Sequence, residues 1–173
     1  VLRQGTDGKA VPFSERDVLG KPCYDIPTMM DNIAIIDELV QALTDMGWGV
    51  YSFDHEDANG QFEIDFNYAD ALTMADRLVY FRLLANEIAR KHGAFASFMP
   101  KPFADRTGSG AHFNMSLASL AGGENLFAAT PGSDRYNCGV SDLAYQFIGG
   151  VLRHAKAISA VFAPTVNSYK RLV

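Results

Sequence analysis

The sequence is poor in cysteine and has no long apolar segment, and both absences exclude classes of protein. Its 173 residues include two cysteines, Cys23 and Cys138, which lie far apart along the chain. A small disulfide scaffold needs more cysteines, and a structural zinc site needs clustered ligands. No apolar run reaches the roughly 20 residues that a transmembrane helix requires. We therefore expect two unpaired thiols and no membrane-spanning segment.

A strong excess of one charge is also missing. The chain has 15 lysines and arginines against 20 acidic residues, a formal charge of −5. Nucleic-acid-binding domains usually present a basic face, so we expect no nucleic-acid partner. Hydrophobic residues make up 48% of the chain, which is too many for a disordered protein and enough for an ordinary core. The N-terminus resembles no signal peptide, so a cytoplasmic location is expected by default.

Two segments in the first half of the chain have the apolar spacing of amphipathic helices. In the first, apolar side chains follow at intervals of three and four from Ile33 to Leu43, with Asp31 as the expected N-cap and Gly47 as the stop. The second runs from about residue 67 to the basic turn before Gly93. Its expected core-facing residues are Tyr68, Leu72, Ala75, Val79 and Leu83.

A third helix is predicted from Ser141 to about Phe162, and its internal Gly149-Gly150 pair suggests close packing against a neighbour. Between the helices lie four candidate strands, Gly49–Glu56, Gln61–Asn67, Ala94–Met99 and Ala111–Leu117. The mixture predicts an α+β fold, in which helices pack against a largely antiparallel sheet.

An acidic hairpin is the most informative segment. The Asn-Gly pair at 59–60 is typical of a two-residue hairpin turn. That turn would place Glu56 opposite Glu63 and Asp54 opposite Asp65, with all four carboxylates on one face. Directly opposed carboxylates repel, so a hard cation such as Mg²⁺ or Mn²⁺ would stabilise them. A solvated acidic face without a ligand remains the alternative.

The segment from Thr107 to Leu117 combines a Gly-Ser-Gly loop with a strictly alternating pattern. Glycines allow backbone amides to approach a ligand closely. One face of the expected strand is polar, with His112, Asn114 and Ser116, and the other is apolar and expected in the core. His112 is either a contact to a metal ion or anion, or a structural histidine.

Five separated motifs resemble, in order, those of the catalytic domain of glutamine synthetase. They are Asp54-His55-Glu56 with Gly60-Gln61-Phe62-Glu63, then Phe98-Met99-Pro100-Lys101-Pro102, Gly108-Ser109-Gly110-Ala111-His112, Asn125-Leu126-Phe127, and Pro164 to Arg171. The wording of the hairpin motif is most similar to the type III-like or γ-glutamylmethylamide synthetase branch. The resemblance covers the chain from about Tyr24 to its end and implies the fold of that catalytic domain.

The resemblance implies an ATP-dependent ligase. In that family the γ-carboxylate of glutamate is phosphorylated, and ammonia then displaces phosphate to give glutamine. The implied cofactors are two divalent cations per site, Mg²⁺ or Mn²⁺, with ATP as co-substrate. Two alternatives stay open: a synthetase for γ-glutamyl methylamide or polyamines, and a catalytically inactive structural or regulatory relative.

The family's site residues can be carried over by position. Implied catalytic residues are Glu56 and Arg171, and the implied metal ligands are Glu56, Glu63 and His112. Implied substrate-binding residues are Gly108, His112, Arg171 and Tyr24, and those near the nucleotide are Ser116 and Asn114. Asp54, Thr107 and Asn114 depart from the commoner family residues, which leaves the amine acceptor and the nucleotide contacts open.

Residues 1–173 are expected to form a partial catalytic domain. Both ends look cut, and the family's N-terminal β-grasp domain and its C-terminal ligands are not found in this sequence. We therefore expect this piece to be inactive alone, and a longer parent to be an active homo-oligomer.

Overall fold

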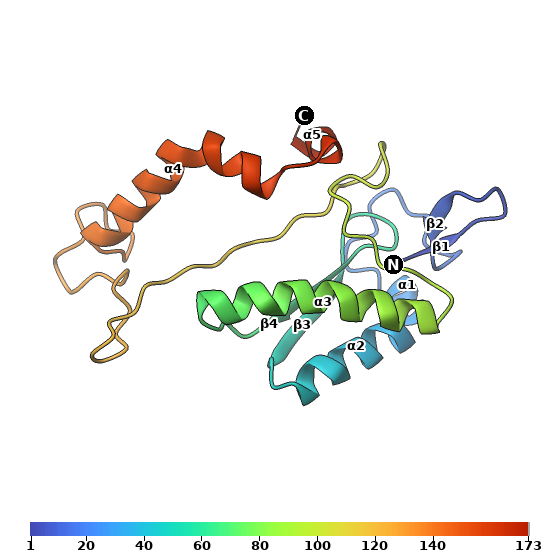
Figure 1. Ribbon diagram of the computed structural model, residues 1–173, viewed down its shortest axis with the longest axis horizontal. Helices are drawn as coiled ribbons and strands as arrows, with labels where there is room; N and C mark the ends of the chain where they lie inside the picture. Colours follow the sequence, from blue (N-terminus) through green and yellow to red (C-terminus); the bar gives the residue numbers. More distant parts are fainter. Residues whose placement is uncertain (173) are drawn as a thin grey trace. The chain divides into compact units, whose positions relative to one another are not determined.

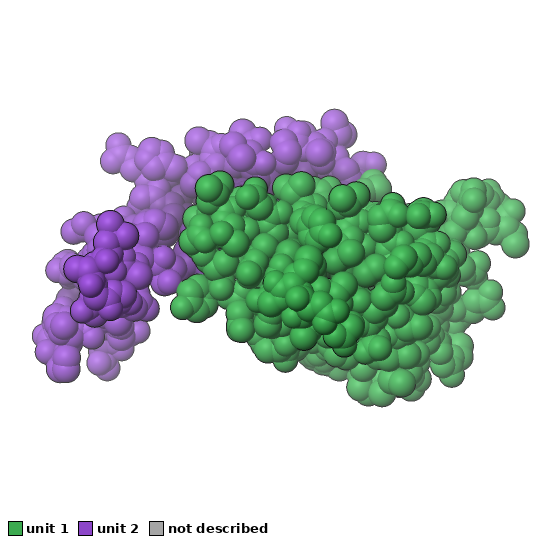
Figure 2. Space-filling view, turned by 60° about the horizontal axis from the view of Figure 1, so that its bottom comes forward, with its two compact units in different colours: residues 1–109, 173 green, residues 110–172 purple. Residues whose placement is uncertain are grey.

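The computed structural model describes residues 1–172, which form two compact units, residues 1–109 and residues 110–172 (Figure 2). No helix in this described part is both long and apolar enough to cross a membrane. The elements (Figure 1) are β1 (Leu2–Gln4), β2 (Ala10–Pro12), α1 (Ile26–Asp31), α2 (Ile33–Asp45), β3 (Val50–His55), β4 (Phe62–Phe66), α3 (Ala71–Lys91), α4 (Asp142–Phe162) and α5 (Val166–Leu172).

The first unit is built around the packing of α2 on α3. Of the apolar face predicted for α2, Ile36 and Leu43 are buried and Ile33 and Val40 are half-buried, while Ile35 and Leu39 are also buried. Gly47 ends the helix with a positive φ of 72°. Strands β3 and β4 form an antiparallel pair, and part of their apolar side packs on the same core. The core residues are Ile35, Leu39, Leu43, Trp48, Ala85, Ile88, Ala89 and Ala94.

Helix α3 buries the opposite face from the one predicted. Leu72, Val79 and Leu83 are exposed, whereas the buried residues are Ala85, Ile88 and Ala89, with Phe81 and Leu84 partly buried. At about 100° per residue these two sets lie on opposite sides of the helix. The helix therefore carries two apolar stripes, and the core of this unit takes the second.

The predicted N-cap of α2 is wrong. Asp31 ends the short helix α1, and its carboxylate accepts hydrogen bonds from Ser14 Oγ at 2.6 Å and Arg16 Nε at 2.9 Å. Asn32 takes the N-cap position of α2 but makes no side-chain capping bond. Asp31 is therefore used to tie the N-terminal segment to α1.

Two predicted strands do not form, and two unpredicted ones do. In the segment 94–99, only Phe95 makes a β-bridge, to Leu2, and residues 111–117 have no regular structure and are exposed. β1 and β2 pair instead at the N-terminal end of the chain. A strand needs a partner for its backbone hydrogen bonds, and alternation of side chains alone does not supply one.

The second unit contains α4 and α5. Ser141 caps α4 by accepting a hydrogen bond from the backbone N–H of Ala144 at 3.2 Å, as predicted. No described atom lies within 4 Å of a Cβ placed on Gly149 or Gly150, so the predicted close packing is not found there. The α+β class with antiparallel strands is confirmed, in the form of two separate two-stranded sheets.

Candidate functional site

The acidic hairpin forms, but its register differs from the predicted one by two residues. Asp54 pairs with Glu63 and His55 with Phe62, and the backbone N–H of Glu56 donates to Gln61 O at 2.8 Å. The connecting loop therefore has four residues, 57–60, in place of two. The predicted pairs Glu56–Glu63 and Asp54–Asp65 are wrong, because the longer loop moves every partner.

The negative charge of the hairpin is nonetheless concentrated where it was predicted. Asp54 and Glu63 lie directly opposite each other, and Glu56 follows one step beyond the end of β3. The pKa of the Cys23 thiol is raised, mainly by desolvation and to a smaller extent by the negative charge of Glu56. The pKa of the Tyr24 hydroxyl is also raised, mostly by the charge of Cys23 and next by the carboxylate of Asp54. The field of the carboxylates thus reaches the Cys23-Tyr24 segment.

The donor set fits a hard divalent cation in its chemistry. Mg²⁺ and Mn²⁺ prefer oxygen ligands, and the opposed carboxylates need a positive charge to offset their repulsion. Among residues 1–172, no three histidine, cysteine or acidic side chains are placed so that they could hold a metal ion together. Glu56 and Glu63 would therefore supply only part of a coordination shell.

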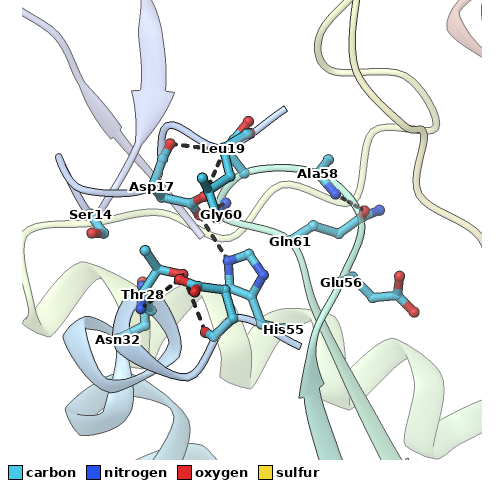
Figure 3. A network of polar contacts seen from close by, with 12 residues as sticks. Ser14, Asp17, Leu19, Thr28, Asn32, His55, Glu56, Ala58, Gly60 and Gln61 are labelled. Atoms are coloured by element: carbon cyan, nitrogen blue, oxygen red, sulfur yellow. Dashed lines mark hydrogen bonds and ion pairs between the residues drawn. The ribbon is translucent and has the colours of Figure 1, made fainter. Parts of the chain in front are cut away.

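A buried polar cluster lies behind the hairpin loop, and the sequence did not predict it (Figure 3). The Asp17 carboxylate accepts hydrogen bonds from His55 Nε2 at 2.9 Å, Asn59 Nδ2 at 2.6 Å and Gly60 N at 2.6 Å. Asn59 also donates to the backbone carbonyls of Asp17 at 2.8 Å and Leu19 at 3.0 Å. All three side chains, Asp17, His55 and Asn59, are at most 3% exposed.

Tyr24 lies beside this cluster in a constrained backbone conformation. Its φ is +63°, a value that residues other than glycine rarely adopt. Its N–H donates to His55 O at 2.8 Å, while its side chain remains 70% exposed. The hydrogen bond and the helix-capping carboxylate of Asp25, which accepts from Thr28 N at 3.1 Å, fix this turn. Tyr24 is thus presented to solvent on the acidic side of the unit.

The hairpin loop also holds the segment that leads into the Gly-Ser-Gly loop. Gln61 Nε2 donates to Gly108 O at 3.2 Å, and the hydroxyl of Thr107 donates to the carboxylate of Asp57. Ser109 N donates to Pro100 O at 2.9 Å, which closes the loop on itself. Gly108, predicted to bind substrate, is therefore attached to the same loop that follows Glu56.

The remaining predicted site residues belong to the second unit. His112, Asn114 and Ser116 lie in the exposed irregular segment, and its predicted apolar face is not in a core, since Phe113 is 55% exposed. The Phe113 ring packs against Phe162, with a centroid separation of 5.3 Å. The guanidinium of Arg171 lies 3.5 Å from a Cβ placed on Gly110, which sets it beside the end of the Gly-Ser-Gly loop.

The chain is similar to known proteins in sequence and in fold. The family described as glutamine synthetase, catalytic domain, matches residues 5–173. A glutamate–methylamine ligase of Methyloversatilis universalis is 45% identical over 99% of this chain. A glutamine synthetase of Rhizobium meliloti is 45% identical over 90% of it. A solved GmaS/ADP complex superposes with a TM-score of 0.88 at 46% identity and covers 98% of this chain. The chain spans 38%, 35% and 38% of these three proteins, respectively.

Proposed function

Because the chain belongs to the glutamine synthetase family, whose catalytic domain matches it almost throughout, we propose that it is part of an ATP-dependent ligase. The ligase joins an amine to the γ-carboxylate of glutamate. One observation in the structure carries the proposal: the hairpin that concentrates carboxylates also holds, through Gln61 and Asp57, the loop that contains Gly108. The groups proposed to bind cation and the loop proposed to bind substrate are thereby attached to each other within one unit.

The proposed reaction has two displacements. A γ-carboxylate oxygen of glutamate attacks the terminal phosphorus of ATP and releases ADP. The amine then attacks the acyl carbon of γ-glutamyl phosphate, loses a proton and expels phosphate, which leaves an amide. Two divalent cations, Mg²⁺ or Mn²⁺, would offset negative charge on the phosphoryl group as it moves.

Each predicted site residue has a part in this proposal. Glu56 and Glu63 hold cation, and Glu56 with Tyr24 faces the incoming amine. Arg171 binds a carboxylate of glutamate, because a planar guanidinium matches a carboxylate in two hydrogen bonds. His112 contributes a further ligand, with Asn114 and Ser116 beside the nucleotide. These roles follow the family resemblance. The similarity to a solved GmaS/ADP complex supports the proposal that a nucleotide binds.

Two amines are candidates. Ammonia is the first, and the match to glutamine synthetases supports it. Methylamine is the second. The methylamine ligase is 45% identical to the chain, as is the Rhizobium meliloti glutamine synthetase, but it matches 99% of the chain where the synthetase matches 90%. Both require the same metals and the same phosphorylated glutamate, so they differ only in the pocket that receives the amine.

The test uses the full-length protein that contains this chain, supplied with ATP, Mg²⁺ and glutamate. We expect ADP release that depends on an added amine, and mass spectrometry of the product identifies glutamine or γ-glutamylmethylamide. Glu56→Gln should reduce turnover at least 100-fold, because it removes a cation ligand next to the reacting groups.

Glu15→Gln is the matched control, since Glu15 is an exposed carboxylate paired only with Arg3 in this unit. It should leave turnover unchanged. Absence of amine-dependent ADP release from the wild-type protein with ammonia and with methylamine would contradict the proposal, and would favour an inactive structural relative. The chain of residues 1–173 alone should be inactive.

A further inference from the structure

The buried cluster at Asp17 holds the hairpin on both sides of Glu56. Through Asn59 and Gly60 it holds the four-residue loop, and through His55 it holds the last residue of β3 before Glu56. Figure 3 shows the Asp17 carboxylate between Gly60 and the His55 ring, with the Glu56 side chain directed away from the cluster. The cluster therefore contacts the backbone on both sides of Glu56 and leaves its carboxylate accessible.

A buried carboxylate is costly unless its hydrogen-bonding capacity is used. Asp17 is 3% exposed and accepts three side-chain and backbone N–H groups, two of them from the loop itself. Moving the loop would remove two of the three donors of the carboxylate and separate the Asn59 amide from its acceptors, which is costly for buried groups. The loop is thereby held in one conformation.

The ring of His55 adds a directional constraint. With Nε2 donating to Asp17, Nδ1 carries the lone pair, and this buried atom has no hydrogen-bond partner. The same residue's carbonyl accepts the N–H of Tyr24 at 2.8 Å. His55 thus links the Asp17 carboxylate through its ring, and the strained turn at Tyr24 through its backbone carbonyl, to the strand that leads into Glu56.

The loop passes this constraint on to a second segment. Asp57 and Gln61 flank the Asn59-Gly60 turn and bind Thr107 and Gly108, respectively. An altered loop would therefore displace the predicted substrate segment together with the predicted cation ligand.

We propose that Asp17 is a positioning residue of the ligase, which sets Glu56 and Gly108 through its hydrogen bonds to His55, Asn59 and Gly60. This rests on the proposed function for the roles of Glu56 and Gly108. Asp17 touches neither substrate nor cation. Its effect reaches them through the loop, so its replacement should alter cation affinity and glutamate binding more than nucleotide binding.

The test compares Asp17→Asn with wild type in the full-length protein. The variant keeps the volume but replaces one acceptor oxygen by an NH₂ donor, so the amide cannot accept from His55 Nε2, Asn59 Nδ2 and Gly60 N together as the carboxylate does. We expect the Mn²⁺ dissociation constant, measured by electron paramagnetic resonance, to rise about tenfold or more, as for other residues that orient metal ligands. The KM for glutamate should rise similarly, and the KM for ATP should stay within twofold.

Ring ¹⁵N chemical shifts of His55 provide a signature that a loss of stability alone would not produce. They should report an Nε2–H tautomer in the wild type and a changed state in Asp17→Asn. Glu15→Gln, the exposed neighbouring carboxylate, should leave the Mn²⁺ affinity and both KM values unchanged.

If Asp17→Asn does not fold, Asn59→Ala decides the question, because it removes the amide donor and leaves the Asp17–His55 pair intact. It should weaken Mn²⁺ binding in the same direction. Wild-type Mn²⁺ affinity and glutamate KM in a folded Asp17→Asn variant, or in Asn59→Ala, would overturn the inference. Because Mn²⁺ affinity is read without turnover, that result is distinct from a wild-type protein that binds Mn²⁺ but forms no amide.

Discussion

At the scale of single residues, burying a polar group in the first unit has a cost even where hydrogen bonds are provided, and two described atoms, Asn32 Oδ1 and His55 Nδ1, are buried without a partner. The amino group of Val1 shows the cost: it donates to Gly60 O, yet burial lowers its pKa to about 5, and the negative charge of Asp17 opposes this only in part. Asp17 itself could not be identified from the sequence. It lies in a polar, turn-rich stretch, and its partners are about 40 residues away.

The Val1 amine predicts a pH dependence of folding for the chain of residues 1–173. Its ordinary pKa is 8.0 and its folded pKa is about 5, so between these values the unfolded chain binds the extra proton. Stability contributed by this group therefore increases as the pH rises from 5 to 8. Urea unfolding across this range measures the increase. A chain acetylated at Val1 should lose this part of the dependence, and identical pH profiles would contradict the assignment.

At the scale of elements, local chemistry was predictable and pairing was not. Gly47 and Ser141 end and begin their helices as the sequence indicated, because a left-handed stop and an N-cap depend on adjacent atoms. Both hairpin strands were located, but their register was missed. The length of the loop is set by the contacts of Asn59 and Gly60 with Asp17, which no local pattern reveals.

Two glycine substitutions separate backbone strain from steric overlap. Gly47→Ala places a Cβ in open space at φ +72° and should cost about 1 kcal/mol. Gly60→Ala has a similar φ of +69°, but its Cβ would lie 2.5 Å from the Val1 carbonyl oxygen. Overpacking adds about 1–3 kcal/mol, so Gly60→Ala should be the more destabilising. Urea unfolding free energies of the two variants provide the measurement, and equal losses would argue against the overlap.

At the scale of the whole molecule, the family resemblance is confirmed, while the positions of the site residues relative to one another remain a prediction. His112, Asn114, Ser116 and Arg171 belong to a different compact unit from Glu56 and Glu63. The predicted strand at 111–117 failed because a strand depends on a neighbouring strand, which alternation does not identify. The face of α3 was missed for a related reason, since periodicity cannot rank two apolar stripes.

The two stripes of α3 and the core of α2 predict opposite responses to substitution. Leu43 is 0% exposed, so Leu43→Ala should lower the free energy of unfolding by about 2–5 kcal/mol. Leu72 is 75% exposed, and Leu72→Gln should change the free energy of unfolding by less than about 0.5 kcal/mol. Chemical denaturation measures both. A large loss for Leu72→Gln would show that the exposed stripe is covered in solution.

The Asn59-Gly60 turn has a further consequence, for the chemical lifetime of the chain. Asparagine followed by glycine is open to deamidation, in which the glycine nitrogen attacks the side-chain amide carbon and expels ammonia to form a cyclic imide. Here Gly60 N donates to Asp17, and the Asn59 amide donates to Asp17 and Leu19. Cyclisation must break these buried contacts, so the folded chain should age more slowly at this dipeptide than a denatured one. The hydrogen bonds that shape the turn also preserve its covalent structure.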